Sequence, residues 1–306
     1  MRALVVGKRI ADFESFWHRV TEPMPAQLFA ARLAGRRIGG VGRRGKFVVF
    51  ELDDGDALIV SLRMTGKLLF QEQRATADAY TRATVLFDDG SVLDFADTRK
   101  FGRMAIVDLK ELAGEPERGA AKMPLHRALG IEPLSRRFTA RWLAELFRRR
   151  PRAAIKPLLL DQRAIAGVGN IYAIEALWRA RLHPQRSAGS LKPAEVARLH
   201  EAIRWVLRKG IRFGGASRRD YRDARGQQGR MQREFNVYDR AGEPCPRCGR
   251  SIVRTVVGGR GTFHCPRCQR SPMMETMAVS DQARNQGGRG GAPAKKGVLR
   301  IGAKRR

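Results

Sequence analysis

All four cysteines of the chain lie in one segment near its end, with the spacing C-x2-C-x16-C-x2-C. Thiolates are soft ligands, and two C-x2-C pairs can each hold one edge of a tetrahedral Zn²⁺. Four sulfurs leave no open coordination position, so the expected metal has a structural role. Two disulfides or a redox C-x-x-C motif are the alternatives, and the lack of a secretory signal disfavours them. The predicted ligands of one Zn²⁺ are Cys245, Cys248, Cys265 and Cys268.

The chain carries a large positive charge, with 60 Lys and Arg against 30 Asp and Glu and a formal net charge of +30. A field of this sign attracts polyanions, so nucleic acid or an anionic membrane is the candidate partner. No stretch approaches the roughly 18 apolar residues of a membrane span, and neither end has an amphipathic basic helix. We therefore expect a cytoplasmic protein that binds nucleic acid and no membrane.

The first third of the sequence has the pattern of a β-rich domain. Residues 46–52 and 57–62 are apolar segments on either side of an Asp-Asp-Gly-Asp turn. Residues 83–87 and 91–95 flank a second Asp-Asp-Gly turn. Such turns between apolar segments are typical of β-hairpins, and two hairpins with further strands predict a sandwich or barrel-like sheet.

Beyond a polar connector at 112–137 the apolar period becomes helical. Thr139 is a candidate N-cap for a helix over 140–149. Further helices are expected over 171–179 and 193–213, and a Gly-Gly pair follows the last of them. With 306 residues the chain can form two domains and a small module, so the predicted fold class is α+β.

The short motif Gly167-Val-Gly-Asn170 comes directly before a predicted helix. Its two glycines allow close backbone approach, Asn170 can cap the helix, and the free N–H groups of a helix start can bind an anion. An ordinary corner between two helices explains the same residues equally well.

Several longer motifs succeed one another along the chain. They are Arg44-Gly-Lys46, Met64-Thr-Gly66, Asp97-Thr-Arg-Lys-Phe-Gly102, Lys156-Pro-Leu-Leu-Leu-Asp-Gln162, Ala166-Gly-Val-Gly-Asn-Ile-Tyr172 and the cysteine segment from Gly242 to Gln269. Their order resembles the formamidopyrimidine-DNA glycosylase and endonuclease VIII family, and the formamidopyrimidine branch fits better. The likeness extends from about Val6 to Arg270.

The resemblance implies both an architecture and an activity. Residues 1–124 would form an N-terminal β-sandwich, 125–230 a helix–two-turn–helix domain and 231–270 a zinc-finger β-hairpin, with 271–306 as a disordered basic tail. Enzymes of this family flip an oxidised purine out of duplex DNA, cut its glycosidic bond and break the strand by β- and δ-elimination through a Schiff base. The implied partner is damaged double-stranded DNA, bound by a monomer with no obligate protein partner. A loop around 214–229 would choose among oxidised bases.

Flipping a nucleotide leaves a hole in the base stack. The resemblance implies that Met64, Arg99 and Phe101 fill this hole. Two apolar wedges fill volume, and a guanidinium can hydrogen-bond the orphaned base. Without the resemblance, Met64 and Phe101 would be interpreted as core residues.

Other positions match residues that contact the DNA backbone or assist elimination. Lys46 and Arg260 match catalytic residues at the phosphates, and the planar fork of an arginine suits phosphate. By residue alone, a solvated lysine at a strand end is the commoner interpretation of Lys46. The remaining matches to DNA-binding residues are Arg150, Lys156, Asn170 and Tyr80, the last where the family usually has a histidine.

The start of the sequence departs from the family pattern. Relatives open Met-Pro-Glu-Leu-Pro-Glu, where the proline amine is the nucleophile and the glutamate an acid/base group. This chain opens Met1-Arg-Ala-Leu and matches the family only downstream of that segment. We expect a working glycosylase and lyase whose first residues are absent from this sequence. The alternatives are a binder of damaged DNA that does not excise the base, and a zinc-bearing DNA-binding protein without lesion preference.

Overall fold

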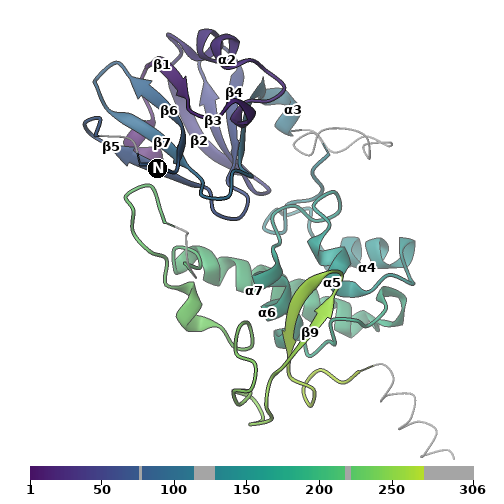
Figure 1. Ribbon diagram of the computed structural model, residues 1–306. Coiled ribbons are helices and arrows are strands. Elements are labelled where there is room, and N and C mark those ends of the chain that lie inside the picture. Colours follow the sequence, from purple (N-terminus) through teal and green to yellow (C-terminus); the bar gives the residue numbers. More distant parts are fainter. Residues whose placement is uncertain (76–77, 114–127, 218–221, 272–306) are drawn as a thin grey trace, which may run out of the picture.

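The computed structural model of the protein describes residues 1–75, 78–113, 128–217 and 222–271. A β-sandwich forms the first part, a group of helices the second, and a two-stranded hairpin the third (Figure 1). This arrangement confirms the predicted α+β class. The predicted boundary at 124/125, much of the connector and the tail from 272 onward lie outside the described residues.

The sandwich consists of two four-stranded antiparallel sheets with the orders β1-β6-β7-β5 and β2-β3-β4-β8. Both predicted hairpins are present, as the pairs β3–β4 and β6–β7. The strands are β1 (Ile10–Ser15), β2 (Ile38–Arg44), β3 (Phe47–Leu52), β4 (Asp56–Ser61), β5 (Lys67–Gln71), β6 (Thr81–Phe87), β7 (Val92–Ala96) and β8 (Arg103–Asp108).

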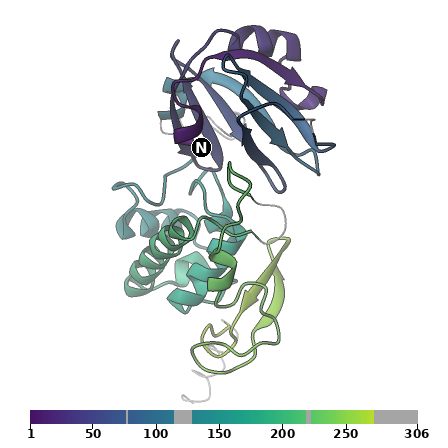
Figure 2. The same cartoon turned by 90° about the vertical axis from the view of Figure 1, so that its left-hand side faces the viewer.

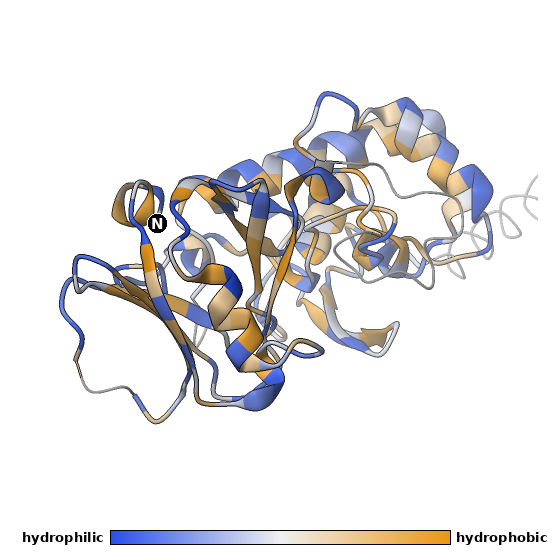
Figure 3. Cartoon of the chain, turned by 90° about the horizontal axis from the view of Figure 1, so that it is seen from above, coloured by the Kyte–Doolittle hydropathy of each residue, from blue (hydrophilic) through white to orange (hydrophobic). Residues whose placement is uncertain are grey.

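Large apolar side chains from both sheets meet between the layers. Phe50 and Leu58 come from one sheet, and Leu93 and Phe95 from the other, and each of them is almost completely buried. Seen from above in Figure 3, the strands carry long hydrophobic stretches, whereas many of the connecting loops are hydrophilic. Two short helices, α1 (Arg2–Val5) and α2 (Ala26–Leu33), and the 3-10 turn η1 (His18–Val20) complete this layer, and α3 (Leu109–Ala113) follows β8.

The helical domain is built around the antiparallel neighbours α6 and α7. Thr139 caps α4 as predicted, because its hydroxyl accepts a hydrogen bond from Trp142 N at 3.1 Å. The long helix α7 ends where Gly214 and Gly215 adopt positive φ angles. The elements are α4 (Ala140–Arg149), α5 (Ile155–Leu160), α6 (Asn170–Ala180), η3 (Ala188–Ser190), α7 (Pro193–Arg212) and η4 (Met231–Glu234).

The hairpin of β9 (Val253–Val257) and β10 (Arg260–His264) packs against α6. Ile174 and Trp178 of the helix form a small core with Phe263 of the hairpin. Glu175, fully buried on α6, accepts hydrogen bonds from the backbone N–H groups of residues 236–238 and thereby fixes the chain that leads into the hairpin. In Figure 2 the tip of the hairpin points toward the β-sandwich.

The turn between β2 and β3 reaches into the helical domain. The Arg44 guanidinium donates to the backbone carbonyls of Leu129 and Gly130, at 2.8 and 3.0 Å. Glu132 accepts from Arg43 at 2.8 Å and from the backbone N–H of Gly45. A return contact comes from the segment after α7, where Ala224 O accepts from Phe70 N of β5. Within the described residues, no helix is long and apolar enough to cross a lipid bilayer.

Candidate nucleic-acid interface and zinc centre

Three basic side chains converge where the two domains and the hairpin meet. Lys46 lies in the turn between β2 and β3, Lys156 lies on α5, and Arg260 begins β10. The Arg260 charge acts on both lysines. The Lys46 amine lies 3.9 Å from the position that a Cβ would take on Gly169, just before α6. Residues more than 200 positions apart in sequence therefore form one cationic cluster.

The pKa of Lys46 is lowered to about 8. The largest cause is loss of water around the ammonium by burial, although part of the side chain remains accessible to solvent. The positive charges of Arg260 and Arg63 add to the effect. Arg63 was not among the predicted residues, although it precedes the Met64-Thr-Gly66 motif directly.

Lys156 has no exposed surface and lies beneath the hairpin. Its Nζ atom is 3.5 Å from the carbonyl oxygen of Val257, the last residue before the tip. Burial first, and the charge of Arg260 second, lower the pKa of Lys156 to about 8. The prediction that Lys156 contacts DNA stays a prediction, and the structure places it under the element that carries Arg260.

Asn170 is the first residue of α6 rather than its cap, because Gly169 occupies the N-cap position. The predicted capping role is therefore wrong. The Asn170 amide instead donates to Gly261 O on the hairpin at 3.0 Å, and its Oδ1 atom is buried without a partner among the described residues. An unpartnered buried oxygen of this kind is available to a ligand or to water.

Arg150 lies at the exposed end of α4, where it forms an ion pair with Asp161 at 2.8 Å. Tyr80 is 48% exposed on the sandwich. No described contact joins either residue to the cationic cluster, so their assignment to DNA stays a prediction.

Met64, Arg99 and Phe101 lie together on the surface of the sandwich. The Arg99 guanidinium stacks on the Phe101 ring at 4.8 Å and approaches the Met64 sulfur at 3.2 Å. Met64 is 68% exposed and Phe101 48%, so the interpretation of these two residues as core is wrong. Large apolar side chains exposed at one place mark an interaction site.

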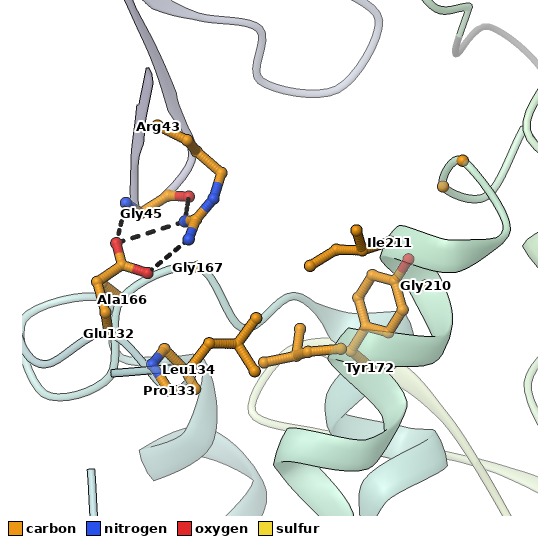
Figure 4. Close-up of a pocket in the computed structure, with 13 residues that line it drawn as sticks. Arg43, Gly45, Glu132, Pro133, Leu134, Ala166, Gly167, Tyr172, Gly210 and Ile211 are labelled. Carbon is orange, nitrogen blue, oxygen red and sulfur yellow. Dashed lines mark hydrogen bonds and ion pairs between the residues drawn. The ribbon is translucent and has the colours of Figure 1, made fainter. Parts of the chain in front are cut away.

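A cavity of about 340 Å³ lies at the junction of the two domains. Figure 4 shows Arg43, Gly45 and Glu132 on one side of it and Tyr172 and Ile211 on the other. Burial by itself raises the pKa of Glu132, but hydrogen bonds from Arg43 and from the Gly45 N–H, with the arginine charges, lower it overall. The Arg43–Glu132 pair was not foreseen, because the recognised motif begins only at Arg44.

The four cysteine sulfurs lie within 4.8 Å of one another, at the end of the hairpin away from Arg260. All four are free thiols, and the Sγ atoms of Cys248 and Cys265 are 3.5 Å apart, well beyond an S–S bond of about 2.05 Å. Burial first, and the neighbouring sulfurs second, raise the pKa of Cys268 to about 12. Four ionised thiols at this spacing require a cation, and the donor set suits one tetrahedral Zn²⁺. The zinc prediction is confirmed, with Cys245, Cys248, Cys265 and Cys268 as ligands.

Comparison with known proteins places these features in a family. Three family models match the chain: the Formamidopyrimidine-DNA glycosylase N-terminal domain over residues 1–104, its H2TH domain over 129–222, and the zinc finger found in FPG and IleRS over 242–270. A formamidopyrimidine-DNA glycosylase of Roseiflexus sp. strain RS-1 is 49% identical over 87% of this chain and 94% of its own length. The enzyme of that name from Enterococcus faecalis is 43% identical over 88% and 92%.

Solved structures agree with the sequence relatives. The Fpg of Lactococcus lactis, in a complex with DNA that contains an abasic site, superimposes with a TM-score of 0.79 at 35% identity, over 88% of this chain and 95% of that one. A second complex of the same enzyme, with DNA that contains Fapy-dG, gives a TM-score of 0.78 at 34% identity, over 88% and 96%. The chain belongs to the formamidopyrimidine-DNA glycosylase family.

Proposed function

We propose that this protein is a base-excision-repair enzyme that removes oxidised purines, such as 8-oxoguanine and formamidopyrimidines, from duplex DNA and nicks the abasic site that remains. The observation that carries the proposal is the exposed group of Met64, Arg99 and Phe101, which we call the insertion triad. An exposed apolar wedge beside a guanidinium suits a base stack from which one nucleotide has been removed.

The cationic cluster supports the proposal because it offers positive charge to the DNA phosphates. Arg63 links the two sites, since it precedes Met64 in the chain and its charge acts on Lys46. We infer that Lys46 and Arg260 hold the phosphates that flank the everted nucleotide and assist the elimination steps, with Lys156 and Asn170 supporting them. Charged hydrogen bonds to phosphate fix the register of the DNA, and the triad detects the missing base.

The junction cavity supports a place for the everted base. It is lined by Gly45, the neighbour of Lys46, and by Gly214 and Gly215, which begin the segment predicted to select the base. A zinc ion held by the four cysteine sulfurs would supply no chemistry to the reaction, because four protein ligands leave no open position; it would hold the hairpin in shape and thereby direct Arg260. We propose that the enzyme acts as a monomer on damaged duplex DNA in the cytoplasm, at the nucleoid.

Binding of duplexes with and without a tetrahydrofuran abasic analogue tests recognition. We expect the protein to prefer the analogue, and Phe101→Ala or Met64→Ala to reduce that preference by about tenfold, because a truncated wedge fills less of the hole. Phe16→Ala is the matched control, since Phe16 is an aromatic side chain that is 50% exposed outside the triad. Equal affinity of the unmodified protein for both duplexes would contradict the proposal.

Cleavage of an 8-oxoguanine duplex tests the chemistry. The assay compares this chain with a version that carries an added Pro-Glu-Leu-Pro-Glu segment at its amino terminus. We expect the extended version to excise the base and nick the strand, and its Lys46→Ala variant to lose most strand cleavage. An extended version that binds the abasic analogue but leaves 8-oxoguanine intact would instead favour a damaged-DNA binder without excision activity.

A further inference from the structure

The insertion triad is carried by two loops that share one buried side chain, Asp97. Met64 lies in the loop between β4 and β5, and Arg99 and Phe101 lie in the loop between β7 and β8. Asp97 is 1% exposed and stands at the start of the second loop. Among the described residues, the donors that its carboxylate binds all belong to these two loops.

One carboxylate oxygen binds donors of both loops, and the other binds only the loop between β7 and β8. Oδ1 accepts from the Thr65 hydroxyl, next to Met64, and from Arg99 N at 3.2 Å. Oδ2 accepts from the backbone N–H groups of Phe101 and Gly102, at 2.8 and 2.7 Å. Hydrogen bonds to an ionised acceptor are stronger than neutral ones, and here they reach atoms of both DNA-inserting loops.

The backbone of Asp97 extends the same network. Its N–H donates to Tyr80 O at 2.9 Å, and its carbonyl accepts from Arg82 Nε at 2.8 Å. Apart from Lys46, the sandwich residues predicted to touch DNA are Met64, Tyr80, Arg99 and Phe101. Asp97 is hydrogen-bonded either to each of these residues or to its neighbour in the chain.

The loop around Asp97 has a backbone shape that its side chain holds in place. Lys100 adopts φ 59°, a left-handed conformation that is unfavourable for a lysine. Gly102 has no room for a Cβ, which would lie 3.0 Å from Ser61 O and against the Phe95 ring. A buried acceptor that binds three N–H groups of this turn offsets the cost of such a conformation.

We propose that Asp97 is a positioning residue that joins the two loops of the insertion triad, so that Met64, Arg99 and Phe101 enter the base stack as one preformed unit. This inference rests on the proposed function, because it explains why the protein should prefer DNA that contains a lesion. Preformed loops bind without losing the entropy of ordering at the moment of contact. Removal of the link therefore weakens binding to a vacated stack more than binding to an intact duplex.

Asp97→Asn tests the link with almost no change in volume. An asparagine NH₂ group at the Oδ2 position faces the N–H groups of Phe101 and Gly102, and at the Oδ1 position it faces the Arg99 N–H. In either orientation the loop between β7 and β8 therefore loses an acceptor that holds it. We expect the preference for a tetrahydrofuran duplex over an intact duplex to fall by about tenfold, while affinity for the intact duplex stays within about twofold. Thr65→Val should give part of this loss, and Thr65→Ser should behave as the unmodified protein.

Asp94→Asn is the matched control. Asp94 is a buried aspartate of the same sheet that accepts from Thr84 and Gln71, away from the two loops. We expect it to lower the melting temperature as Asp97→Asn does and to leave the lesion preference unchanged. Equal loss of preference in both variants would overturn the proposal, because a general loss of stability would then explain the effect.

A fluorescent readout separates positioning from weaker binding. 2-Aminopurine placed next to the tetrahydrofuran reports loss of stacking when the triad inserts, and it is read at saturating protein. Asp97→Asn should reduce this signal at saturation, and a full signal would overturn the inference. If Asp97→Asn does not fold, the comparison of Thr65→Val with Thr65→Ser decides by the same readout. An unmodified protein that shows no lesion preference would instead contradict the proposed function.

Discussion

Lys46 and Lys156 both lie close to Arg260, and their proton affinities are lowered by that crowding as well as by burial. A phosphate bound by Lys46 and Arg260 adds a negative charge close to both lysines. It therefore favours the protonated form of each lysine, and binding of DNA is coupled to proton uptake once the pH exceeds about 8.

This coupling predicts a pH dependence. Below pH 8 both lysines are charged and the affinity for duplex DNA should be nearly constant. Above it the affinity should fall, by up to about tenfold per pH unit for each proton that must be taken up. Lys46→Arg should reduce the slope by one proton, because arginine stays charged. Fluorescence anisotropy at constant ionic strength measures the slope.

The exposed Lys192, just before α7 and outside the cluster, supplies the control for this experiment. Lys192→Arg should leave the slope unchanged. An unmodified protein whose affinity does not change above pH 8 would show that neither lysine receives a phosphate.

Single residues also show which contacts could be predicted from the sequence and which could not. The Thr139 cap was predicted because its signal is local, since a threonine before a helical period finds its partner three residues later. Asp97 stood inside a recognised motif, and its bond to Arg99 N, two residues on, is a local turn signal. Its bond to Thr65 joins positions 32 residues apart, and no spacing rule predicts such a contact.

At the scale of elements, the zinc hairpin holds the metal ligands at one end and the predicted phosphate-binding arginine at the other. The sulfur ligands lie at one end, and Arg260 lies at the other, just after the Gly258-Gly259 tip. Asn170 and Lys156 contact the hairpin near its tip, and Trp178 contacts Cys245 Sγ at 3.5 Å near its base. The orientation of Arg260 thus depends on both the metal and helices α5 and α6.

Because the two ends of the hairpin differ in role, arginine substitutions at the two ends should affect DNA binding differently. Arg260→Ala should weaken DNA binding and lower the salt dependence of the affinity by about one phosphate contact, because one cation is removed from the interface. Zinc content, measured by elemental analysis, should stay at one ion per chain. Arg250→Ala removes an exposed arginine at the metal end and should leave the salt dependence intact. Loss of zinc from Arg260→Ala would mean that Arg260 has a structural role.

The elements that could be predicted are those with local signals. The hairpins β3–β4 and β6–β7 were foreseen from their Asp-Gly turns, and α7 from its period and its glycine stop. The pairing of β1 with β6 and of β5 with β7 could not be predicted, because antiparallel partners distant in sequence are chosen by packing of the whole sandwich. The closeness of Lys46 to Arg260 was not predicted either, because the family resemblance implied only that each of them contacts phosphate.

At the scale of the molecule, Glu132 connects the domains. It accepts from Arg43, Arg44 and the Gly45 N–H, all from the turn that carries Lys46. Gly45 and Gly167 approach so closely that a Cβ on Gly167 would lie 3.3 Å from Gly45 O. The relative placement of Lys46 and α6 thus depends on one carboxylate and two glycines.

Glu132→Gln should destabilise the protein at pH 7 by about 1–3 kcal/mol, since arginines would lose their charged partner. The pKa of Glu132 is lowered in the folded state, so its contribution is present above the unfolded value of 4.5 and is lost as the pH falls through the folded value. The difference in unfolding free energy between the two proteins should therefore shrink in acid, as measured by urea unfolding.

Glu145→Gln provides the comparison, because Glu145 pairs with Arg148 and Arg149 on the open surface of α4. Solvent screens such pairs, so this variant should unfold almost as the unmodified protein does. A Glu132→Gln protein as stable as the Glu145→Gln protein at pH 7 would show that Glu132 does not contribute measurably to holding the domains together.

The bond from Phe70 to Ala224 has a further consequence for solubility. β5 is an outer strand of its sheet, and a bare outer strand can recruit strands of other molecules. The segment after α7 covers part of this border, the exposed edge of β5. A variant that loses this contact would uncover more of the border, and its tendency to self-associate should increase.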